Sequence, residues 1–195
     1  MKLSKLSRLF ISAFLLTPFA LLGLGTPSLA ASTPKGKVGL TCTPDQLKDK
    51  VLGKERNHLR TFDNLDFDVF TNQKWDRLKE SHAPDILVHW PDGHTTTGIE
   101  RHISDLKALF VYAPDTRILE HPIRIGCGDL TAVTGVFEGT FTKPLPLPDG
   151  TSIAPTGKAF KIPMATIGRW ANNVMVEEFL FWDNQTYAQQ IGLSK

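Results

Sequence analysis

Residues 87–102 read "LVHWPDGHTTTGIERH" and hold three histidines, one aspartate and one glutamate within sixteen positions. Imidazoles and carboxylates bind metals and transfer protons, so this stretch is a metal site, an acid–base site or a polar loop. Zinc sites commonly place two ligands one helical turn apart, but Glu100 and His102 are only two positions apart. His89 and His94 lie on either side of a Pro-Asp-Gly turn. The spacing does not indicate a metal, and we expect neither a metal ion nor an organic cofactor.

The apolar stretch "VMVEEFLFWD" carries the carboxyl groups best suited to acid–base chemistry. Side chains alternate between the two faces of a strand. One predicted face holds Met175, Glu177, Phe179, Phe181 and Asp183, and the other holds Val174, Val176, Glu178, Leu180 and Trp182. Whichever face lines an apolar interior carries one glutamate inward. Burial there raises a carboxyl pKa towards the value that a general base needs near neutral pH.

Three residues are the candidate catalytic groups: Asp183, Glu178 and His89. The alternative role for Asp183 is to cap the short helix predicted over "NQTYAQQIGL". The alternative for Glu178 is a salt bridge to Arg169 across a hairpin. His89 shares a strand face with Leu87, so it either points into a pocket and relays protons or is a core histidine bonded to backbone.

Aromatic and histidine side chains supply candidate ligand contacts at Trp90, Phe110, His121 and Trp182. Aromatic side chains mostly build cores, and those at the open end of a pocket stack on a flat ligand. His121 follows the third predicted helix, where it either faces the pocket or lies at a strand edge.

The elements that must position these groups follow from the hydrophobic periodicity. A first helix is predicted to start at Thr43, Pro44 and Asp45 and to be interrupted at Gly53, and a short second helix covers "KWDRLKESHA". The strand "DILVHW" and the helix "GIERHISDLKALFVYAP" follow. Two strands around "GCGD" and a hairpin turning at "ANN" complete the pattern. Helices first and a meander afterwards predict an α+β fold, with helices on one face of a curved antiparallel sheet and an apolar pocket between them.

Residues 1–30 have the pattern of a secretory signal peptide: a basic start, an apolar run and small residues at Ser28 and Ala30. We expect cleavage after Ala30, a flexible segment over 31–42 and one domain over 43–195. The product would be secreted or periplasmic, without stable membrane anchoring. The leader holds three basic and no acidic residues, so its removal changes the formal charge from +2 to −1. A near-neutral chain gives no reason to expect nucleic acid as a partner.

The two cysteines, Cys42 and Cys127, are enough for one disulfide in an exported protein. They lack the paired spacing of a zinc or redox site. Sequence alone does not bring them within bridging distance, so two separate thiols are the favoured interpretation.

Five stretches in a fixed order carry a family resemblance, and together they cover about residues 60–193. They are "FDNLDFDVFTNQKWDRL", "APDILVHWPDG", "TGIERHISDLKALFVYAPD", "GDLTAVTGVFEGTF" and "VMVEEFLFWDNQTYAQQIGL". In these stretches the chain resembles the SnoaL-like branch of the nuclear-transport-factor-2-like superfamily, which includes polyketide cyclases and predicted ester cyclases. The resemblance implies a cone-shaped sheet wrapped on about three helices, with a pocket at the open end. It also implies one pocket aspartate as the acid–base residue, for which Asp183 is the first candidate and Glu178 the second.

The expected function is therefore that of an exported SnoaL-like domain. As an enzyme it would be a cofactor-independent cyclase or isomerase that acts on a small apolar carbonyl or ester compound. The alternative is a non-catalytic periplasmic ligand-binding or interaction domain, because one fold hosts many functions. The sequence leaves open whether the chain is an enzyme. Because folds of this kind often pair through the outer face of the sheet, we expect a homodimer.

Overall fold

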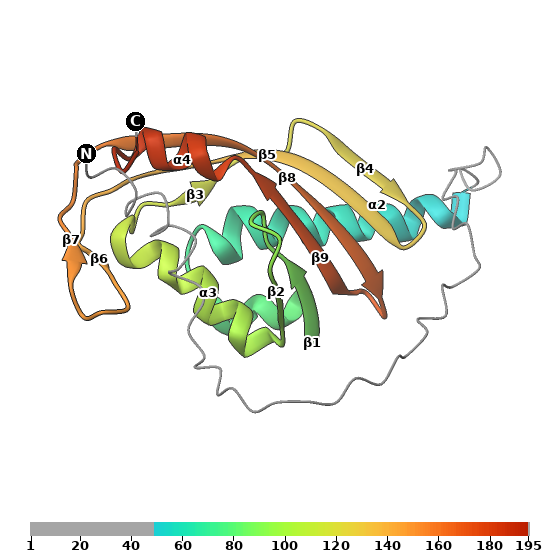
Figure 1. Ribbon diagram of the computed structural model, residues 1–195. Coiled ribbons are helices and arrows are strands. Elements are labelled where there is room, and N and C mark those ends of the chain that lie inside the picture. Colours follow the sequence, from blue (N-terminus) through green and yellow to red (C-terminus); the bar gives the residue numbers. More distant parts are fainter. Residues whose placement is uncertain (1–48, 195) are drawn as a thin grey trace, which may run out of the picture.

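The computed structural model describes residues 49–194 (Figure 1). Its helices are α2 (Asp49–Asn64), the π-helical η2 (Leu65–Phe70), the 3₁₀-helical η3 (Trp75–Glu80), α3 (Ile99–Tyr112) and α4 (Asn184–Gln190). The predicted signal peptide, the flexible segment and the helix start at Thr43 lie outside the described residues. Gly53 does not interrupt the first helix, because α2 runs through it; an isolated glycine costs a helix only about 1 kcal/mol relative to alanine.

Seven strands form one sheet in the order β2-β1-β9-β8-β5-β3, with β4 also paired to β5. The strands are β1 (His82–His89), β2 (Thr95–Thr97), β3 (Arg117–Ile118), β4 (Arg124–Cys127), β5 (Leu130–Thr140), β8 (Ala159–Ala171) and β9 (Val174–Trp182). A separate small hairpin joins β6 (Leu145–Pro146) to β7 (Ser152–Ile153). All pairs are antiparallel except β1 with β9, which are parallel. The predicted α+β architecture, a curved antiparallel sheet with helices, is confirmed.

The hairpin between β8 and β9 forms at the predicted turn. Asn172 and Asn173 both have positive φ angles, 51° and 66°, which suits a two-residue turn of type I′. The next step of the ladder is irregular: Trp170 pairs with Met175, but Arg169 pairs with Glu177. Val176 is therefore an extra residue in a β-bulge.

The bulge decides which side chains of β9 face the helices. Met175 and Glu178 are both buried, although they are three positions apart. Strict alternation placed Met175 on the face of Glu177, and that assignment was wrong because the extra residue reverses the alternation between them. Met175 packs over Gly168 of β8, where a Cβ atom would lie 2.6 Å from its sulfur.

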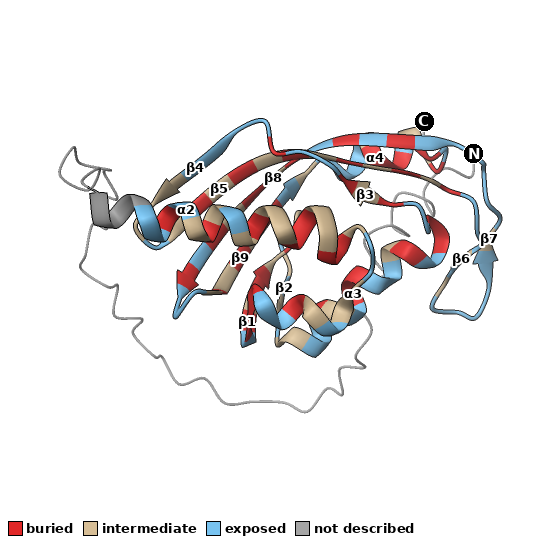
Figure 2. Ribbon diagram, turned by 180° about the vertical axis from the view of Figure 1, so that it is seen from behind, coloured by how far each residue is buried: buried red, intermediate tan, exposed pale blue. Residues whose placement is uncertain are grey.

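The core lies between the inner face of the sheet and the helices, which Figure 2 shows as buried residues along α2 and the strands behind it. Phe62, Val69, Ile86, Ile162 and Trp170 are among its most completely buried members. This packing fixes α2 and η2 across the sheet, so polar side chains on the same helical face are carried into the interior. None of the helices in the described residues is long and apolar enough to cross a membrane.

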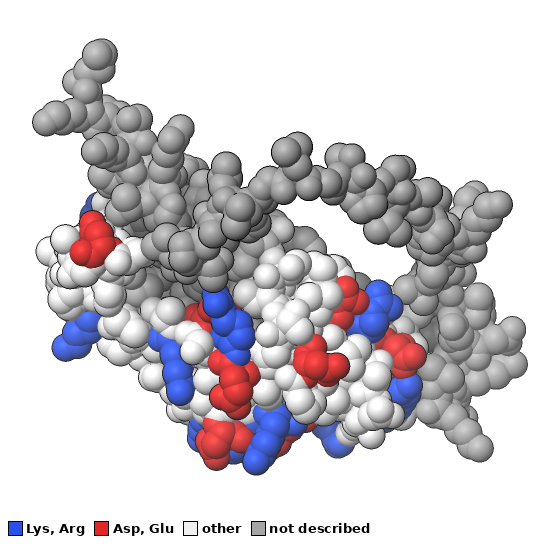
Figure 3. Space-filling model, turned by 60° about the horizontal axis from the view of Figure 1, so that its bottom comes forward, with Lys and Arg blue, Asp and Glu red and all other residues white. Residues whose placement is uncertain are grey.

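Surface charges of both signs are interspersed on the face that Figure 3 presents. Opposite charges also pair closely at the surface: Asp68 contacts Lys74 and Arg77 at 2.6 Å each. A mixed surface of this kind provides no extended basic stripe on the face shown, which agrees with the small formal charge of the whole chain, +2.

Cys127 is disulfide-bonded, which corrects the interpretation as a separate thiol. The only other cysteine in the sequence is Cys42, which lies outside the described residues. The β4–β5 hairpin packs against the first half of α2, where the Gly128 amide donates to the Glu55 carboxylate and Lys54 pairs with Asp129.

Candidate active site

A cavity of about 60 Å³ lies between the sheet and the helices. Its wall is mostly apolar and includes Phe70, Leu106, Phe137, Leu180 and Trp182. Its polar lining consists of Asp66, His82, His102, Thr166 and Glu178. A water molecule needs roughly 10–15 Å³ on this measure, so the cavity accommodates about four to six non-hydrogen atoms.

Glu178, His82 and His102 form the first of two ionisable clusters, here called the glutamate cluster. β9 supplies the carboxylate, while β1 and α3 supply the imidazoles. Glu178 Oε2 lies 3.3 Å from His102 Nε2 and 3.6 Å from His82 Nε2. All three residues are buried, with at most 4% of any of them exposed.

The charge state of Glu178 differs from the sequence-based expectation. Burial alone would raise the pKa of this carboxyl, but the attraction of His102 and His82 outweighs burial and brings the pKa below its ordinary value. The expectation of a raised pKa for the pocket glutamate was wrong because the two imidazoles arrive from other elements. Glu178 is thus an ionised group and a weak base.

Asp63, His121 and Asp66 form the second group, here called the histidine cluster. His121 Nδ1 bonds to Asp63 Oδ1 at 2.9 Å, and its Nε2 bonds to Asp66 Oδ2 at 2.8 Å. Arg124 closes the outer end with a 2.8 Å contact to Asp63 Oδ2. The cluster therefore leads from a half-exposed arginine to Asp66, which lines the cavity.

Both inner members of the histidine cluster have raised pKa values. Burial raises the pKa of the Asp66 carboxyl, and the nearby negative charge of Glu178 adds to this, against the opposing effect of His121. Burial alone would lower the pKa of His121, but its two carboxylate partners raise it above its ordinary value. Because a raised pKa makes a carboxylate a stronger base, Asp66 has the property that the sequence analysis sought in Glu178.

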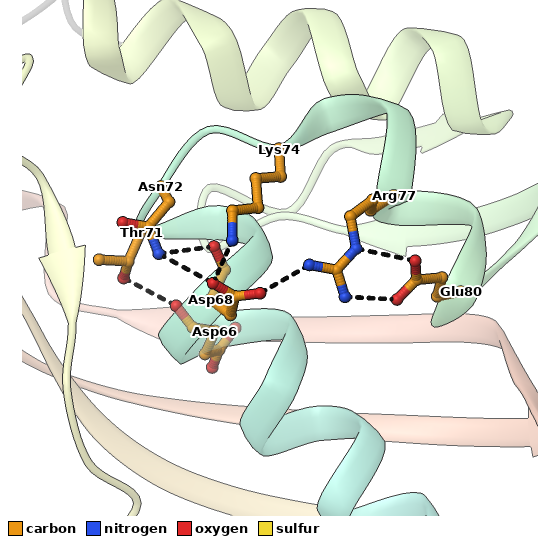
Figure 4. A network of polar contacts seen from close by, with 7 residues as sticks. All are labelled: Asp66, Asp68, Thr71, Asn72, Lys74, Arg77 and Glu80. Carbon is orange, nitrogen blue, oxygen red and sulfur yellow. Dashed lines mark hydrogen bonds and ion pairs between the residues drawn. The ribbon is translucent and has the colours of Figure 1, made fainter.

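The backbone around Asp66 is held by polar contacts between η2 and η3 (Figure 4). The Thr71 hydroxyl donates to the Asp66 carbonyl at 2.7 Å. Asp68 accepts from Lys74 and from Arg77, and Arg77 also donates to Glu80. The π-helical turn is therefore fixed at both ends, which keeps the Asp66 side chain directed at His121 and the cavity.

Asp183 lies at the start of α4 and outside the cavity lining. Its carboxylate accepts from the Thr186 hydroxyl and from the backbone amides of Thr186 and Gln185. These bonds lower the pKa of Asp183. Its position is that of a helix N-cap, the alternative role that the sequence offered.

His89 lies on the outer face of the sheet, where it bonds to Glu177 Oε1 at 2.9 Å and stacks on Phe179 at 4.1 Å. Glu177 also accepts from Arg169 at 2.8 Å. The salt bridge considered for Glu178 is thus made by its neighbour, because the bulge turns Glu178 inward. His89 and the cavity lie on opposite sides of the sheet.

The four candidate ligand contacts differ in their distance from the cavity. Trp182 lines it directly. Trp90 packs against Trp182 and His102, with ring centroids 6.3 and 5.8 Å away. His121 is not part of the lining and is connected to the cavity by its hydrogen bond to Asp66. Phe110 packs on Phe70, whose ring is 5.1 Å away, and is not part of the lining.

Sequence reasoning missed His82 and Asp66. His82 begins β1 with no periodic pattern before it. Asp66 offered a usable signal, because it stands three positions after Asp63 and among the apolar residues Phe62, Leu65 and Val69. Residues three and four apart share a helical face, so a carboxyl at this place is carried into the core.

A family model described as SnoaL-like polyketide cyclase matches residues 62–191. The chain therefore belongs to the SnoaL-like polyketide cyclase family. The matched range contains every member of the two clusters.

Several solved structures have the same fold. A candidate SnoaL-like polyketide cyclase from Jannaschia sp. CCS1 is 21% identical, with a TM-score of 0.61 over 70% of this chain and 92% of the other. IdmH from Streptomyces antibioticus, a candidate polyketide cyclase, is 24% identical, with a TM-score of 0.59 over 69% and 98%. An NTF2-like protein of unknown function from Burkholderia pseudomallei is 17% identical, with a TM-score of 0.57 over 70% and 98%. A search among curated proteins found no match.

Proposed function

We propose that this chain is an acid–base enzyme of the cyclase or isomerase type, with Asp66 as the proton-transferring group. One observation carries the proposal: a buried carboxyl with a raised pKa lines an apolar cavity and is held by His121 at 2.8 Å. Such a carboxyl, oriented by a second group, is what abstraction of a C–H proton near neutral pH requires. Membership of the SnoaL-like family supports this reaction class.

The reaction would begin at the carbon next to a carbonyl group. Asp66 takes the proton from that carbon, and the electron pair of the C–H bond moves into a C=C bond while the carbonyl π pair moves to oxygen. When the substrate carries a β,γ double bond, the enolate regains the proton from Asp66 at the γ-carbon, which is isomerisation. Otherwise the α-carbon attacks a second carbonyl carbon of the same molecule and closes a ring. Asp66 then returns its proton to the oxygen that has received the π pair of that second carbonyl group. The histidines of the glutamate cluster line the same cavity, where they can face the developing oxyanion.

The cavity limits the substrate by size and polarity. Its wall is mostly apolar, and its volume of about 60 Å³ is well below the roughly 300–1,000 Å³ of pockets that enclose drug-sized ligands. A small apolar ketone or ester therefore fits the described residues better than a polycyclic compound does.

Hydrogen–deuterium exchange tests the proposal without knowledge of the natural substrate. Acetone, butanone, cyclopentanone and ethyl acetate are incubated in D₂O with the full chain, and loss of the α-proton signal is followed by NMR. We expect exchange for at least one compound and a loss of at least about 100-fold in D66N, in line with the usual contribution of a general base.

D183N is the matched control, because it makes the same aspartate-to-asparagine change at the helix cap, away from the cavity. It should retain exchange. Equal exchange in D66N and wild type, or no exchange of any compound by folded wild type, would reject Asp66 as the base; the second result would favour a non-catalytic ligand-binding domain.

We also propose that the chain is exported. The leader pattern of residues 1–30 and the disulfide at Cys127 support this, because disulfides persist mainly in oxidising compartments. Expression of the full chain in a Gram-negative host should yield periplasmic protein with Ala31 as its N-terminus. Protein that stays in the cytoplasm with an intact leader would contradict export.

We propose that the outer face of the sheet binds a second copy. An apolar row crosses four strands in register: Phe179 pairs with Ile167, Ile167 with Ala132, and Ala132 with Ile125. Phe181 and Ile125 are half-exposed or more, and exposed apolar patches of this kind commonly mark interfaces. I167E should shift sedimentation equilibrium from dimer to monomer, whereas A159E, at the end of the same strand, should not. A monomeric wild type would contradict the interface.

A further inference from the structure

We propose that His82, His102 and Glu178 bind one divalent transition-metal ion, with Zn²⁺ the best match, and leave an open coordination position towards the cavity. The sequence spacing of histidines gave no such indication, because β1, α3 and β9 each contribute one ligand. Two imidazoles and one carboxylate form a donor set that catalytic zinc sites use.

The two distances from Glu178 to the imidazoles fit a shared metal ion better than they fit hydrogen bonds. The three ligand atoms lie within 4.8 Å of one another, and two of the edges are 3.3 and 3.6 Å. Metal–ligand bonds of about 2.0–2.2 Å at tetrahedral angles give edges of roughly 3.3–3.6 Å. A hydrogen bond between the same atoms would be shorter, at about 2.7–2.9 Å for a charged pair.

Ser81 holds the ring of His82 from the far side. Its hydroxyl lies 3.0 Å from the Leu78 carbonyl oxygen, to which it can donate, and 2.9 Å from His82 Nδ1. With Nδ1 engaged by Ser81, the Nε2 atom of His82 is the one directed at Glu178. A serine bonded to the far nitrogen is also the kind of support that orients metal-binding histidines.

Two polar atoms of the glutamate cluster face one another in a buried place. Within the described residues, His82 Nε2 and Glu178 Oε2 have no hydrogen-bond partner. Buried polar atoms are nearly always satisfied, and leaving one without a partner costs about 1–3 kcal/mol. A cation bound between them satisfies both atoms and His102 Nε2 at once.

A bound metal ion would add to the proposed acid–base function. Its role in catalysis rests on that proposed function. The cluster and Asp66 line the same cavity, so a carbonyl oxygen at the open position would be polarised while Asp66 takes the adjacent proton. Binding of the ion itself depends only on the three ligands.

The test uses the purified full chain after dialysis against EDTA. Isothermal titration with ZnCl₂ at pH 7.5 should show one equivalent bound, and CoCl₂ should give the visible absorption of tetrahedral Co²⁺. H82Q, H102Q and E178Q should each weaken Zn²⁺ binding by at least about 10–100-fold, since even loss of a residue supporting a ligand has an effect of that size.

H89Q is the matched control, because His89 is also paired with a glutamate, but on the outer face of the sheet. It should bind Zn²⁺ as wild type does. D66N should retain the metal while losing exchange, so failure of the acid–base proposal and failure of this one give different results. Folded wild type that binds no stoichiometric metal, or a folded H102Q and E178Q with unchanged affinity, would overturn the proposal.

Discussion

The two ionisable clusters at the cavity contain the same two kinds of side chain in opposite proportions. They also differ in how far their polar atoms are satisfied by hydrogen bonds. The histidine cluster places one imidazole between two carboxylates, and both contacts are hydrogen bonds of 2.8–2.9 Å. The glutamate cluster places one carboxylate beside two imidazoles at 3.3 and 3.6 Å. The first is satisfied by its own residues, whereas the second has atoms that need a cation. Buried histidines and carboxylates can therefore build two kinds of site. One histidine between two carboxylates holds a proton, whereas two histidines beside one carboxylate form a set of metal ligands.

The largest test of this difference removes the imidazole from the histidine cluster. H121L leaves Asp66 buried without its charged partner, so the free energy of unfolding should fall by about 3–5 kcal/mol at pH 7, measured by urea denaturation. H89Q, which breaks a partly exposed pair, should cost less than about 1 kcal/mol.

A second substitution keeps this test decisive if H121L folds poorly. Adding D66N to H121L removes the unpaired charge and should restore part of the lost stability, because the two residues act as one unit. If the double variant is no more stable than H121L, the loss reflects packing and not charge.

The next effect is a dependence of stability on pH. The folded pKa values of His121 and Asp66 are both raised, so the folded chain binds more protons than the unfolded chain. The stability that His121 contributes is present in full below its unfolded pKa of about 6.5 and is lost as the pH rises through the folded pKa. Asp63, Asp66 and Arg124 are the charged groups in contact with this chain of bonds, and Glu178 acts on Asp66 through space.

Urea denaturation at several pH values between 5.5 and 9 measures this loss. H121Q should flatten the decline of stability above pH 6.5 in comparison with wild type. An H121Q profile that declines as steeply as the wild-type profile would contradict a raised pKa for His121.

The smallest effect concerns the coupling between the clusters. The negative charge of Glu178 contributes to the raised pKa of Asp66. E178Q should therefore move the titration of the Asp66 carboxyl, followed by ¹³C NMR, to lower pH. An unchanged titration would show that the clusters act independently, although they line one cavity.

The sequence predicted the architecture better than it predicted the site. The Asn172–Asn173 turn, the helix over Ile99–Tyr112 and the burial of one of the two adjacent glutamates depend on local patterns of turn residues and alternation, and these can be read along the chain. His82 and Glu178 are 96 positions apart, and only the parallel pairing of β1 with β9 brings these two strands together. A reversed pKa for Glu178 could not be foreseen without that pairing.

Asp183 and His89 are residues for which the sequence suggested a chemical role, but the structure places them away from the cavity. Both have residue types suited to chemistry and neighbours that suggested a pocket. Local hydrogen bonds, to α4 in one case and to Glu177 in the other, hold them elsewhere. A residue type and a strand face leave the choice between a structural and a chemical role open when the strand contains a bulge.

The bulge at Val176 also makes the cavity wall tolerant of changes in chain length. Deleting Val176 would leave Met175 and Glu178 two positions apart in a regular ladder, so both would still face inward. The tip of the β8–β9 hairpin can therefore gain or lose a residue, with the irregularity absorbing the difference, while the carboxylate stays in place. A single deletion between Glu178 and Trp182 has no bulge to absorb it. The side chains on one side of that deletion would therefore move to the opposite face of the sheet. Length variation among related chains should accordingly collect on the Asn172 side of the bulge.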